Sequence, residues 1–238
     1  MKRLLIAAIL VAIAGPVSAR DRAPAGNYAN PSAAIAAEIA FAQLAQDKGQ
    51  WTAFRATATA DAVMFVPQLV YVQAYLKDKA NPAAAAKWQP HQVWSSCDGS
   101  IAVTRGAWQQ SGGQQSAGQQ ADATGYFTTV WQRQNDGKYK WVMDQGDALA
   151  MPLDAPDMIV AKVADCPAGK PARAAKRDKI KQLPPLDPAG RSGQSDDGTL
   201  TYAVAVQPDG ARRFTVSLMQ GGQLSPVQIV EVSAPGTK

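Results

Sequence analysis

The chain is poor in the side chains that hold metal ions, with one histidine and two cysteines among 238 residues. Zinc sites use three or four histidine, cysteine or acidic ligands, and a single histidine excludes every motif built on a histidine pair. The sequence therefore predicts no metal site, and we expect no cofactor. Charged residues are also sparse, at 18% against 46% hydrophobic residues. That balance is typical of a chain that folds around an apolar core.

Acidic residues are outnumbered, so the net charge is +5 and the pI about 9.2. A basic excess can indicate a nucleic acid or an anionic membrane as partner. The excess is local, because residues 162–191 hold eight basic and three acidic side chains. We interpret its basic run, between Lys170 and Lys181, as a solvated linker, with a polyanion or a membrane surface as the alternative partner. No aromatic side chains interleave with this run, so no nucleic-acid partner is predicted.

The N-terminus has the pattern of a secretory signal peptide. Lys2 and Arg3 precede an apolar run, and the small residues 17–19 follow it as a cleavage site. The run is too short to cross a bilayer, which takes about 20 apolar residues. We therefore expect a cleaved signal peptide over 1–19 and a polar leader over 20–31. The expected destination is the periplasm, with no stable membrane anchor after cleavage.

Cys97 and Cys166 are the only cysteines. An oxidising compartment favours a disulfide between them, and closing so long a loop stabilises a fold by roughly 4 kcal/mol in the chain-entropy model. The alternative is a pair of free thiols, one of them a nucleophile with His91 as its base.

Helical patterns precede the strands. The first helix is expected over 32–48, with Ser32 as its N-cap. Three apolar residues at spacings of four and three are expected to form its buried face: Ile35, Ile39 and Ala42. Glu38 lies at the edge of that face, where it is expected to reach water. Shorter helices are expected over 51–57 and 71–79, with a strand over 63–66 between them.

From Trp88 onward the periodicity changes to two, which indicates strands. Four are expected, over 89–97, 100–109, 124–134 and 138–145. Asp98-Gly99 forms a hairpin turn that pairs Trp94 with Val103. Helices followed by an antiparallel sheet predict an α+β domain with its helices on one face of the sheet.

The last predicted hairpin turns at Gly137, in a three-residue loop that places Trp131 opposite Trp141. In that register one face of the hairpin is mainly apolar and carries Phe127, Thr129, Trp131, Tyr139, Trp141 and Met143. Asp144 falls on the opposite, more polar face, where it and Asp147 are expected to be solvated.

The composition changes after Cys166. Residues 167–198 are rich in proline, glycine and basic residues, which predicts a linker. Beyond it a C-terminal β segment is expected over 199–238, with strands at 199–206, 212–219 and 226–232. Three strands are marginal alone, so we expect them to dock on the main domain or on a partner.

Two stretches then carry a family resemblance: AFRATATADAVMFVP, residues 53–67, and GYFTTVWQRQNDGKYKWVMD, residues 125–144. They resemble the nuclear-transport-factor-2-like superfamily, which includes ketosteroid isomerases and polyketide cyclases, and most closely a secreted bacterial branch of unknown function. The resemblance covers residues 32–150, and the expected domain extends over 32–166. Its fold would be a cone-shaped, curved antiparallel sheet wrapped on the N-terminal helices, enclosing an apolar pocket. Members often form homodimers through the outer face of the sheet.

The isomerase chemistry of that superfamily finds no match here. By the resemblance, Val66 replaces its catalytic base, Ala42 its oxyanion-hole tyrosine and Thr129 its oxyanion-hole aspartate. Valine and alanine can neither move a proton nor stabilise an enolate, so the resemblance argues against that mechanism and leaves other enzyme activity open.

The resemblance also suggests which residues line a pocket: Phe65, Trp94, Arg105, Thr129, Trp131 and Trp141. The alternative is that the tryptophans belong to the core. Weaker catalytic candidates are His91, Arg105 and Asp144. We therefore expect a pocket that binds a small apolar or amphipathic molecule. The alternatives are a lyase, isomerase or hydrolase that uses the same pocket, and a structural or interaction module that acts as a dimer.

Overall fold

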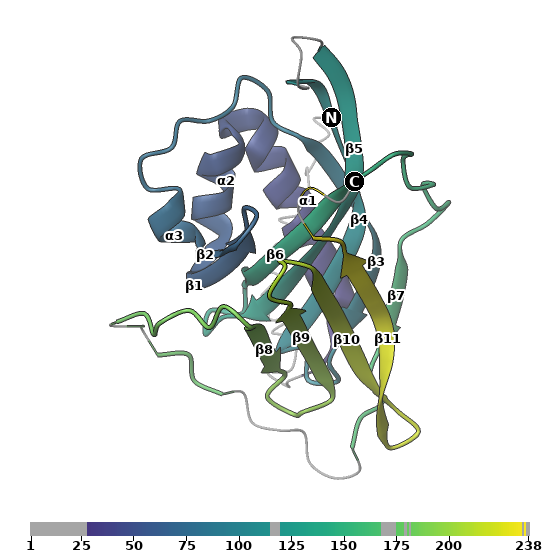
Figure 1. Cartoon of the computed structure of the whole chain (residues 1–238). Helices are drawn as coiled ribbons and strands as arrows, with labels where there is room; N and C mark the ends of the chain where they lie inside the picture. Colours follow the sequence, from purple (N-terminus) through teal and green to yellow (C-terminus); the bar gives the residue numbers. More distant parts are fainter. Residues whose placement is uncertain are drawn as a thin grey trace, which may run out of the picture.

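A computed structural model describes residues 28–114, 120–167, 175–178, 180, 182–234 and 236. It consists of three helices, a curved seven-stranded sheet and a smaller four-stranded sheet (Figure 1). The helices are α1 (Pro31–Lys48), α2 (Gln50–Thr57) and α3 (Val72–Tyr75). The large sheet contains β1 (Ala58–Phe65), β2 (Leu69–Tyr71), β3 (Lys87–Ser95), β4 (Ile101–Gln114), β5 (Gln120–Arg133), β6 (Tyr139–Leu149) and β7 (Val160–Val163). The small sheet contains β8 (Gly190–Gln194), β9 (Leu200–Val206), β10 (Arg212–Gln220) and β11 (Gln223–Val232).

This architecture confirms the predicted α+β class and the cone-like arrangement. The large sheet has the order β2-β1-β6-β5-β4-β3-β7 and does not close. Its hairpins are antiparallel, but β1 pairs parallel with β6, and β3 pairs parallel with β7, so the sheet is mixed rather than wholly antiparallel. Both parallel pairs join strands that are distant in the chain. Turn signals in the sequence predict only antiparallel hairpins, so they do not indicate these pairs.

Helix α1 begins at Pro31, one residue before the predicted start, and its N-cap lies two residues before the predicted one. Asn30 is the N-cap and accepts a hydrogen bond from the backbone N–H of Ala33 (3.1 Å), and Pro31 occupies the first helical position. Proline suits that position because its φ is already helical and its missing N–H has no helical acceptor there. Ser32, the predicted cap, is therefore inside the helix.

The buried face of α1 also differs from the prediction. Its buried residues are Ala34, Glu38, Phe41 and Ala45, whereas Ile39 is 50% exposed. The helix is thus rotated so that Glu38 is fully buried instead of reaching water. Helix α1 contains so many alanines that the spacing of its apolar residues alone does not determine which face is buried.

The two main hairpins have the predicted registers. Trp94 pairs with Val103, and Trp131 pairs with Trp141 across a loop in which Gly137 has φ +81°. The second hairpin contains an irregularity that the periodicity does not reveal. The pair after Trp131–Trp141 is Val130–Met143, so Val142 is an extra residue in β6. Such a bulge reverses the faces of all residues beyond it.

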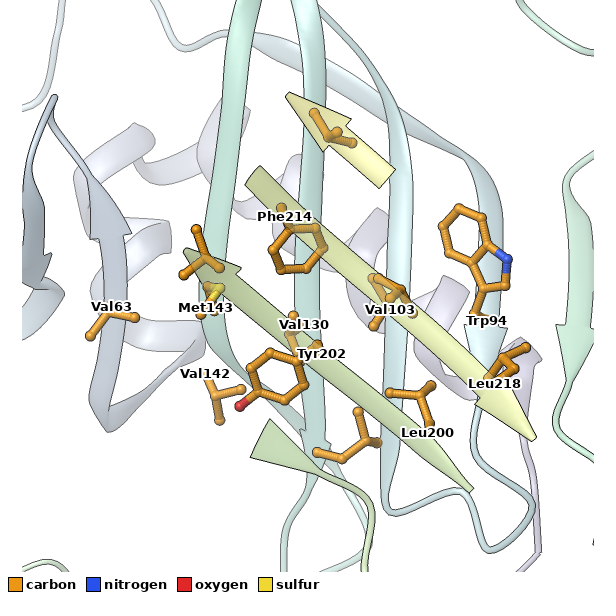
Figure 2. Packing of buried hydrophobic residues seen from close by; sticks show 14 of the residues in the cluster. Val63, Trp94, Val103, Val130, Val142, Met143, Leu200, Tyr202, Phe214 and Leu218 are labelled. Carbon is orange, nitrogen blue, oxygen red and sulfur yellow. The ribbon is translucent and has the colours of Figure 1, made fainter. Parts of the chain in front are cut away.

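The small sheet, in the order β11-β10-β9-β8, packs against the convex face of the large sheet (Figure 1). Val103 and Val130 of the large sheet meet Leu200, Phe214 and Leu218 in one core cluster (Figure 2). The C-terminal strands therefore dock on the main domain. They number four, because β8 lies inside the predicted linker, where Gly190–Gln194 carries no apolar alternation.

The two sheets are joined through a pair of similar turns. Ser-Cys-Asp-Gly-Ser, residues 96–100, connects β3 to β4, and Ser-Asp-Asp-Gly-Thr, residues 195–199, connects β8 to β9. In each turn the aspartate accepts hydrogen bonds from both flanking hydroxyls: Asp98 from Ser96 and Ser100, and Asp197 from Ser195 and Thr199. We call these the twin turns.

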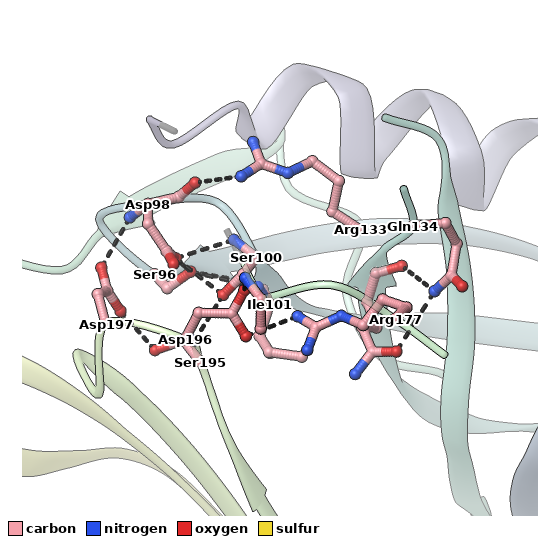
Figure 3. A network of polar contacts seen from close by, with 12 residues as sticks. Ser96, Asp98, Ser100, Ile101, Arg133, Gln134, Arg177, Ser195, Asp196 and Asp197 are labelled. Atoms are coloured by element: carbon pink, nitrogen blue, oxygen red, sulfur yellow. Dashed lines mark hydrogen bonds and ion pairs between the residues drawn. The ribbon is translucent and has the colours of Figure 1, made fainter. Parts of the chain in front are cut away.

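The twin turns bond to each other in a near-reciprocal way, and Figure 3 shows the residues Asp98, Ser100, Asp196 and Asp197 of these contacts. The N–H of Cys97 donates to the hydroxyl of Thr199 (2.9 Å), and the N–H of Asp196 donates to the hydroxyl of Ser100 (2.8 Å). The N–H of Asp98 also donates to the carboxylate of Asp197 (2.8 Å). These contacts fix one end of the small sheet to the large one.

Cys97 and Cys166 form the predicted disulfide, which attaches the first twin turn to the chain after β7. None of the described helices is long and apolar enough to cross a membrane. The predicted signal peptide over 1–19, most of the leader, and Lys170, Arg173, Lys179 and Lys181 of the basic run lie outside the described residues.

Candidate functional site

A hollow of ≈ 260 Å³ lies between the helices and the concave face of the large sheet. Its lining comes from α1, α2, the segment before β3, and strands β3 to β6. The lining residues are Phe41, Gln50, Phe54, Ala86, Trp88, Trp108, Gln110, Tyr126, Phe127, Asp144, Gly146 and Asp147. We call this the aromatic hollow, because half of these residues are aromatic.

Edge-to-face packing orders the helical wall of the aromatic hollow. The ring of Phe41 lies 4.8 Å from that of Trp88 and 4.9 Å from that of Phe54, both in T-shaped contacts. On the sheet side, the indole N–H of Trp108 donates to the backbone carbonyl of Tyr126 (3.1 Å). Rings held in this way present preformed apolar surface to a ligand, at little cost in side-chain entropy.

Glu38 lies behind this wall as a buried hydrogen-bond acceptor. Its carboxylate accepts from the indole N–H of Trp88 (2.7 Å), the indole N–H of Trp131 (2.9 Å) and the hydroxyl of Thr104 (2.6 Å). Burial raises the pKa of Glu38, and the hydrogen bonds from Thr104, Trp88 and Trp131 oppose that rise. Glu38 thus joins α1 to β3, β4 and β5 and sets the depth at which the helix sits in the cone.

Asp144 is one of the two carboxyls that line the aromatic hollow, and the charge of Glu38 acts on it. The hydroxyl of Thr129, its partner across β5 and β6, donates to it at 2.8 Å. Burial raises the pKa of Asp144 to about 7; the bond from Thr129 opposes the rise and the charge of Glu38 adds to it. A carboxyl with such a pKa exchanges its proton near neutral pH, so it can accept or donate a hydrogen bond there.

The β6 bulge explains why Asp144 points inward. Strict alternation from Trp141 places Met143 with the tryptophans and Asp144 on the opposite face. With Val142 as the extra residue, Met143 instead packs in the core between the sheets, and Asp144 shares the concave face with Thr129. The prediction that Asp144 is solvated on a polar outer face is therefore wrong.

The six sequence-predicted pocket residues are not brought together. Thr129, Trp131 and Trp141 lie on the concave side, but both tryptophans are fully buried in the core behind the hollow. The indole N–H of Trp141 donates to the hydroxyl of Thr57 (2.8 Å) and supports the end of α2. These indoles hold the wall of the hollow rather than line it.

Phe65, Trp94 and Arg105 lie on the other side of the sheet. Trp94 belongs to the core cluster between the two sheets, and Phe65 packs against that cluster. The guanidinium of Arg105 lies over the ring of Tyr126, 4.8 Å from its centroid. Arg105 and His91 line a separate hollow on the convex side, away from Asp144. The convex face is buried here, so its apolar residues belong to a second core and not to a pocket.

The positions that the resemblance assigns to the isomerase are also separated. Ala42 lines a surface groove beside Ile39, and Val66 packs against the core under the helices. Only Thr129 lies next to the hollow, where its hydroxyl serves Asp144. Among the described residues no group of three or more histidine, cysteine or acidic side chains could hold a metal ion.

Sequence reasoning missed Glu38, Phe41, Trp88 and Trp108 as parts of this site. A signal was available for two of them, since Glu38 and Phe41 are three residues apart and share a helical face. Nothing in local spacing indicated Trp88, whose bond to Glu38 joins residues 50 apart in the chain.

No protein-family profile matches the sequence, and no curated protein matches it. The solved structures that the chain resembles are ketosteroid isomerase-like and related proteins of the nuclear-transport-factor-2-like fold. A ketosteroid isomerase-like protein from Parabacteroides distasonis has 18% identity and TM-score 0.38, and the match covers 52% of this chain and 96% of that one. An aromatic-ring-hydroxylase-like protein from Novosphingobium aromaticivorans has 21% identity and TM-score 0.39, with 53% and 92% covered. The hub of the calcium/calmodulin-dependent protein kinase II from S. rosetta has 16% identity and TM-score 0.38, with 53% and 99% covered.

Proposed function

We propose that the aromatic hollow binds a small apolar or amphipathic molecule that is uncharged or cationic, in a protein exported to the periplasm. The observation that carries the proposal is the lining itself. Aromatic residues line the hollow together with two carboxyls, those of Asp144 and Asp147, and none of the lining residues is lysine or arginine. A site of ≈ 260 Å³ suits a ligand about the size of one substituted ring.

Charge selects among such ligands. An anionic group beside Asp144 would meet like charge from that carboxyl and from Glu38 behind it, whereas an ammonium would meet opposite charge and aromatic faces. The guanidinium of Arg105 does not offset this negative charge, because Arg105 lines the other hollow, across the sheet. An uncharged or cationic amphiphile therefore satisfies both the rings and the carboxyl.

The test uses three probes of one shape: benzylamine, benzyl alcohol and benzoate. Binding is followed at pH 8 by the rise in melting temperature and by tryptophan fluorescence, since Trp88 and Trp108 line the hollow. We expect benzylamine to bind best and benzoate worst. Asp144→Asn should abolish the preference for the amine, while the exposed Asp136→Asn should leave it unchanged. Equal responses to all three probes, or none, would refute the proposal.

A second candidate function is proton transfer by Asp144, favoured by its pKa of about 7 and by its bond from Thr129. Such a group suits a general base in a lyase, isomerase or hydrolase. The test is hydrogen–deuterium exchange at an acidic C–H of a bound ketone such as phenylacetone. Acceleration by the wild type that Asp144→Asn loses would support an enzyme; unaccelerated exchange would leave a binding protein.

Export is supported by the residues of the signal sequence and by the disulfide between Cys97 and Cys166. N-terminal sequencing of the mature protein should begin at Arg20, and an intact Met1 would exclude cleavage.

Self-association is a further part of the proposal, since one of the similar structures is a hub domain. The small sheet already covers the convex face that the resemblance assigns to dimers, so a homodimer would use another surface. Sedimentation measurements distinguish monomer from dimer.

A further inference from the structure

A second hollow, of ≈ 360 Å³, lies on the convex side at the margin of the small sheet. Three parts of the chain meet there: β3 and β4, the segment after β6 with the start of β7, and β11. The lining residues are His91, Gln92, Arg105, Gly106, Leu153, Asp154, Pro156, Val160 and Gln228. We call it the seam hollow. Gln228 belongs to β11, so the cone domain alone would not form this hollow.

Arg105 is a half-buried cation that has no counter-ion in the part of the chain that the structure describes. Burial lowers the pKa of its guanidinium, and its described contact is the ring of Tyr126. None of the ion pairs among the described residues includes it. Arg212, which lies over the ring of Phe65, differs because it donates to the carbonyl of Gly146 (2.8 Å) and interacts with the charge of Asp147. A charge that is removed from water usually has a partner, so Arg105 is the exception.

The row of residues beside Arg105 contains further unsatisfied polar groups. Arg105 pairs across the strands with Thr128, and Thr128 pairs with Gln145. Thr128 is 0% and Gln145 2% exposed, and neither side chain has a hydrogen-bond partner among the described residues. Buried polar groups are rarely left unpaired, and such groups indicate water or a ligand next to them.

A bulge in β3 directs the side chain of His91 toward the seam hollow. Pro90 pairs with Gly106 and Gln92 with Arg105, so His91 is the extra residue of a bulge in β3. Gly106 permits the close approach, because a Cβ there would lie 1.9 Å from the carbonyl oxygen of Gln89. Bulges reorient side chains next to functional sites. The charge of Arg105 lowers the pKa of His91, after the larger effect of burial.

We propose that the seam hollow binds a small oxyanion, the phosphate or carboxylate group of a solute, with the guanidinium of Arg105 as its main ligand. Arginine fits such groups because its planar fork donates two parallel hydrogen bonds. His91 and the amides of Gln92 and Gln228 supply further donors around it. Asp154 is the one carboxylate in the lining and is exposed, so solvent screens its repulsion. This site is independent of the aromatic hollow, because the two lie on opposite faces of the sheet.

The test uses the fact that His91 is the only histidine. Its ring protons give an unambiguous NMR signal in the full mature chain, prepared without a histidine tag. Inorganic phosphate, acetate and chloride are titrated separately at constant ionic strength and pH. We expect a saturable shift of the His91 signal with phosphate or acetate and none with chloride. The better of the two oxyanions identifies the phosphate or the carboxylate class.

Arg105→Gln should weaken oxyanion binding by at least about tenfold, because it removes a charged donor. The matched control is Arg213→Gln, an exposed arginine of β10 paired with Glu231, which should bind like the wild type. If Arg105→Gln does not fold, Arg105→Lys keeps the charge without the fork and should weaken binding several-fold. A linear shift in all three salts, or unchanged affinity in the Arg105 variants, would overturn the proposal.

Discussion

The two faces of the large sheet both bury large side chains, but they bury polar groups in different ways. On the concave face, Glu38 accepts three hydrogen bonds from Trp88, Thr104 and Trp131, and Asp144 accepts one from Thr129. On the convex face, the core between the sheets is mainly aliphatic (Figure 2). Thr128 and Gln145 beside it have no side-chain hydrogen-bond partner among the described residues.

The difference shows what each cover can supply. Helix α1 brings an acceptor, and the indoles of the sheet donate to it, so the polar groups under the helices are satisfied within the protein. The small sheet contributes Leu200, Phe214 and Leu218, which bury the apolar surface of the large sheet. These side chains offer no hydrogen bonds, so polar groups beneath them must bond to water or to a solute. The concave face thus holds a carboxyl whose pKa is raised by burial, and the convex face holds a cation, Arg105, that has no counter-ion among the ion pairs of the described residues.

The largest expected effect is on the concave face. Glu38→Ala removes the shared acceptor of Trp88, Trp131 and Thr104, at about 1–3 kcal/mol for each buried group that loses it, and adds a cavity. The bonds that remain are weaker: the indole of Trp131 keeps the hydroxyl of Thr104 (3.0 Å), and that hydroxyl keeps only the carbonyl of Thr129 (3.4 Å). We expect the free energy of unfolding, measured in urea, to fall by about 3–5 kcal/mol. The exposed Glu231→Ala should change it by less than about 0.5 kcal/mol. A loss as small as that control would mean that this carboxyl does not hold the concave face.

The next effect concerns the attachment of the convex cover. Replacing Cys97 and Cys166 by serine removes a cross-link between residues separated by 69 positions and should cost about 2–4 kcal/mol in urea unfolding. Reducing the wild type should give the same loss. If the twin turns alone hold the sheets together, the double variant will match the wild type.

A smaller effect, of opposite sign, is expected at Asp144. Its folded pKa of about 7 exceeds the unfolded value, so the folded state binds the extra proton and loses stability as pH rises from about 4 through 7. Asp144→Asn should remove this dependence. We expect the variant to exceed the wild type by about 1–3 kcal/mol at pH 8, with the difference vanishing near pH 4. Parallel stability–pH curves would show that Asp144 ionises normally.

The smallest effect is electrostatic and lies on the convex side. Arg105→Gln removes the charge that, after burial, lowers the pKa of His91, so that pKa should rise. NMR titration of the single histidine measures it directly. The other charged residues that line the two hollows beside His91 are Lys87, Asp154 and Asp157, and they stay in place. A pKa that does not move would place Arg105 too far from His91 to share a ligand.

Much of the fold was predictable because local chemistry determined it. The registers of Trp94 with Val103 and of Trp131 with Trp141 follow from turn residues, and the disulfide follows from having one cysteine pair. The twin turns could also have been found, since Ser-x-Asp-Gly-Ser/Thr occurs twice in the sequence.

The candidate site was less predictable, because partners distant in the chain decide it. The orientation of α1 depends on Glu38 reaching Trp131, 93 residues away. The inward direction of Asp144 depends on one extra residue in β6. Arg105 and Trp94 lie on the convex face, which the small sheet covers. The residue pattern within β3 or β4 does not reveal that another sheet docks there.

Because the small sheet belongs to the same chain, the convex face stays covered when the protein is diluted. A surface buried by a second subunit is exposed again when the protein concentration falls below the dissociation constant. Here the partner strands belong to the same chain, and tethered segments meet at effective concentrations in the millimolar range or above. Burial of that face is therefore independent of how much protein is present, and the seam hollow, which needs β11, persists in a single molecule.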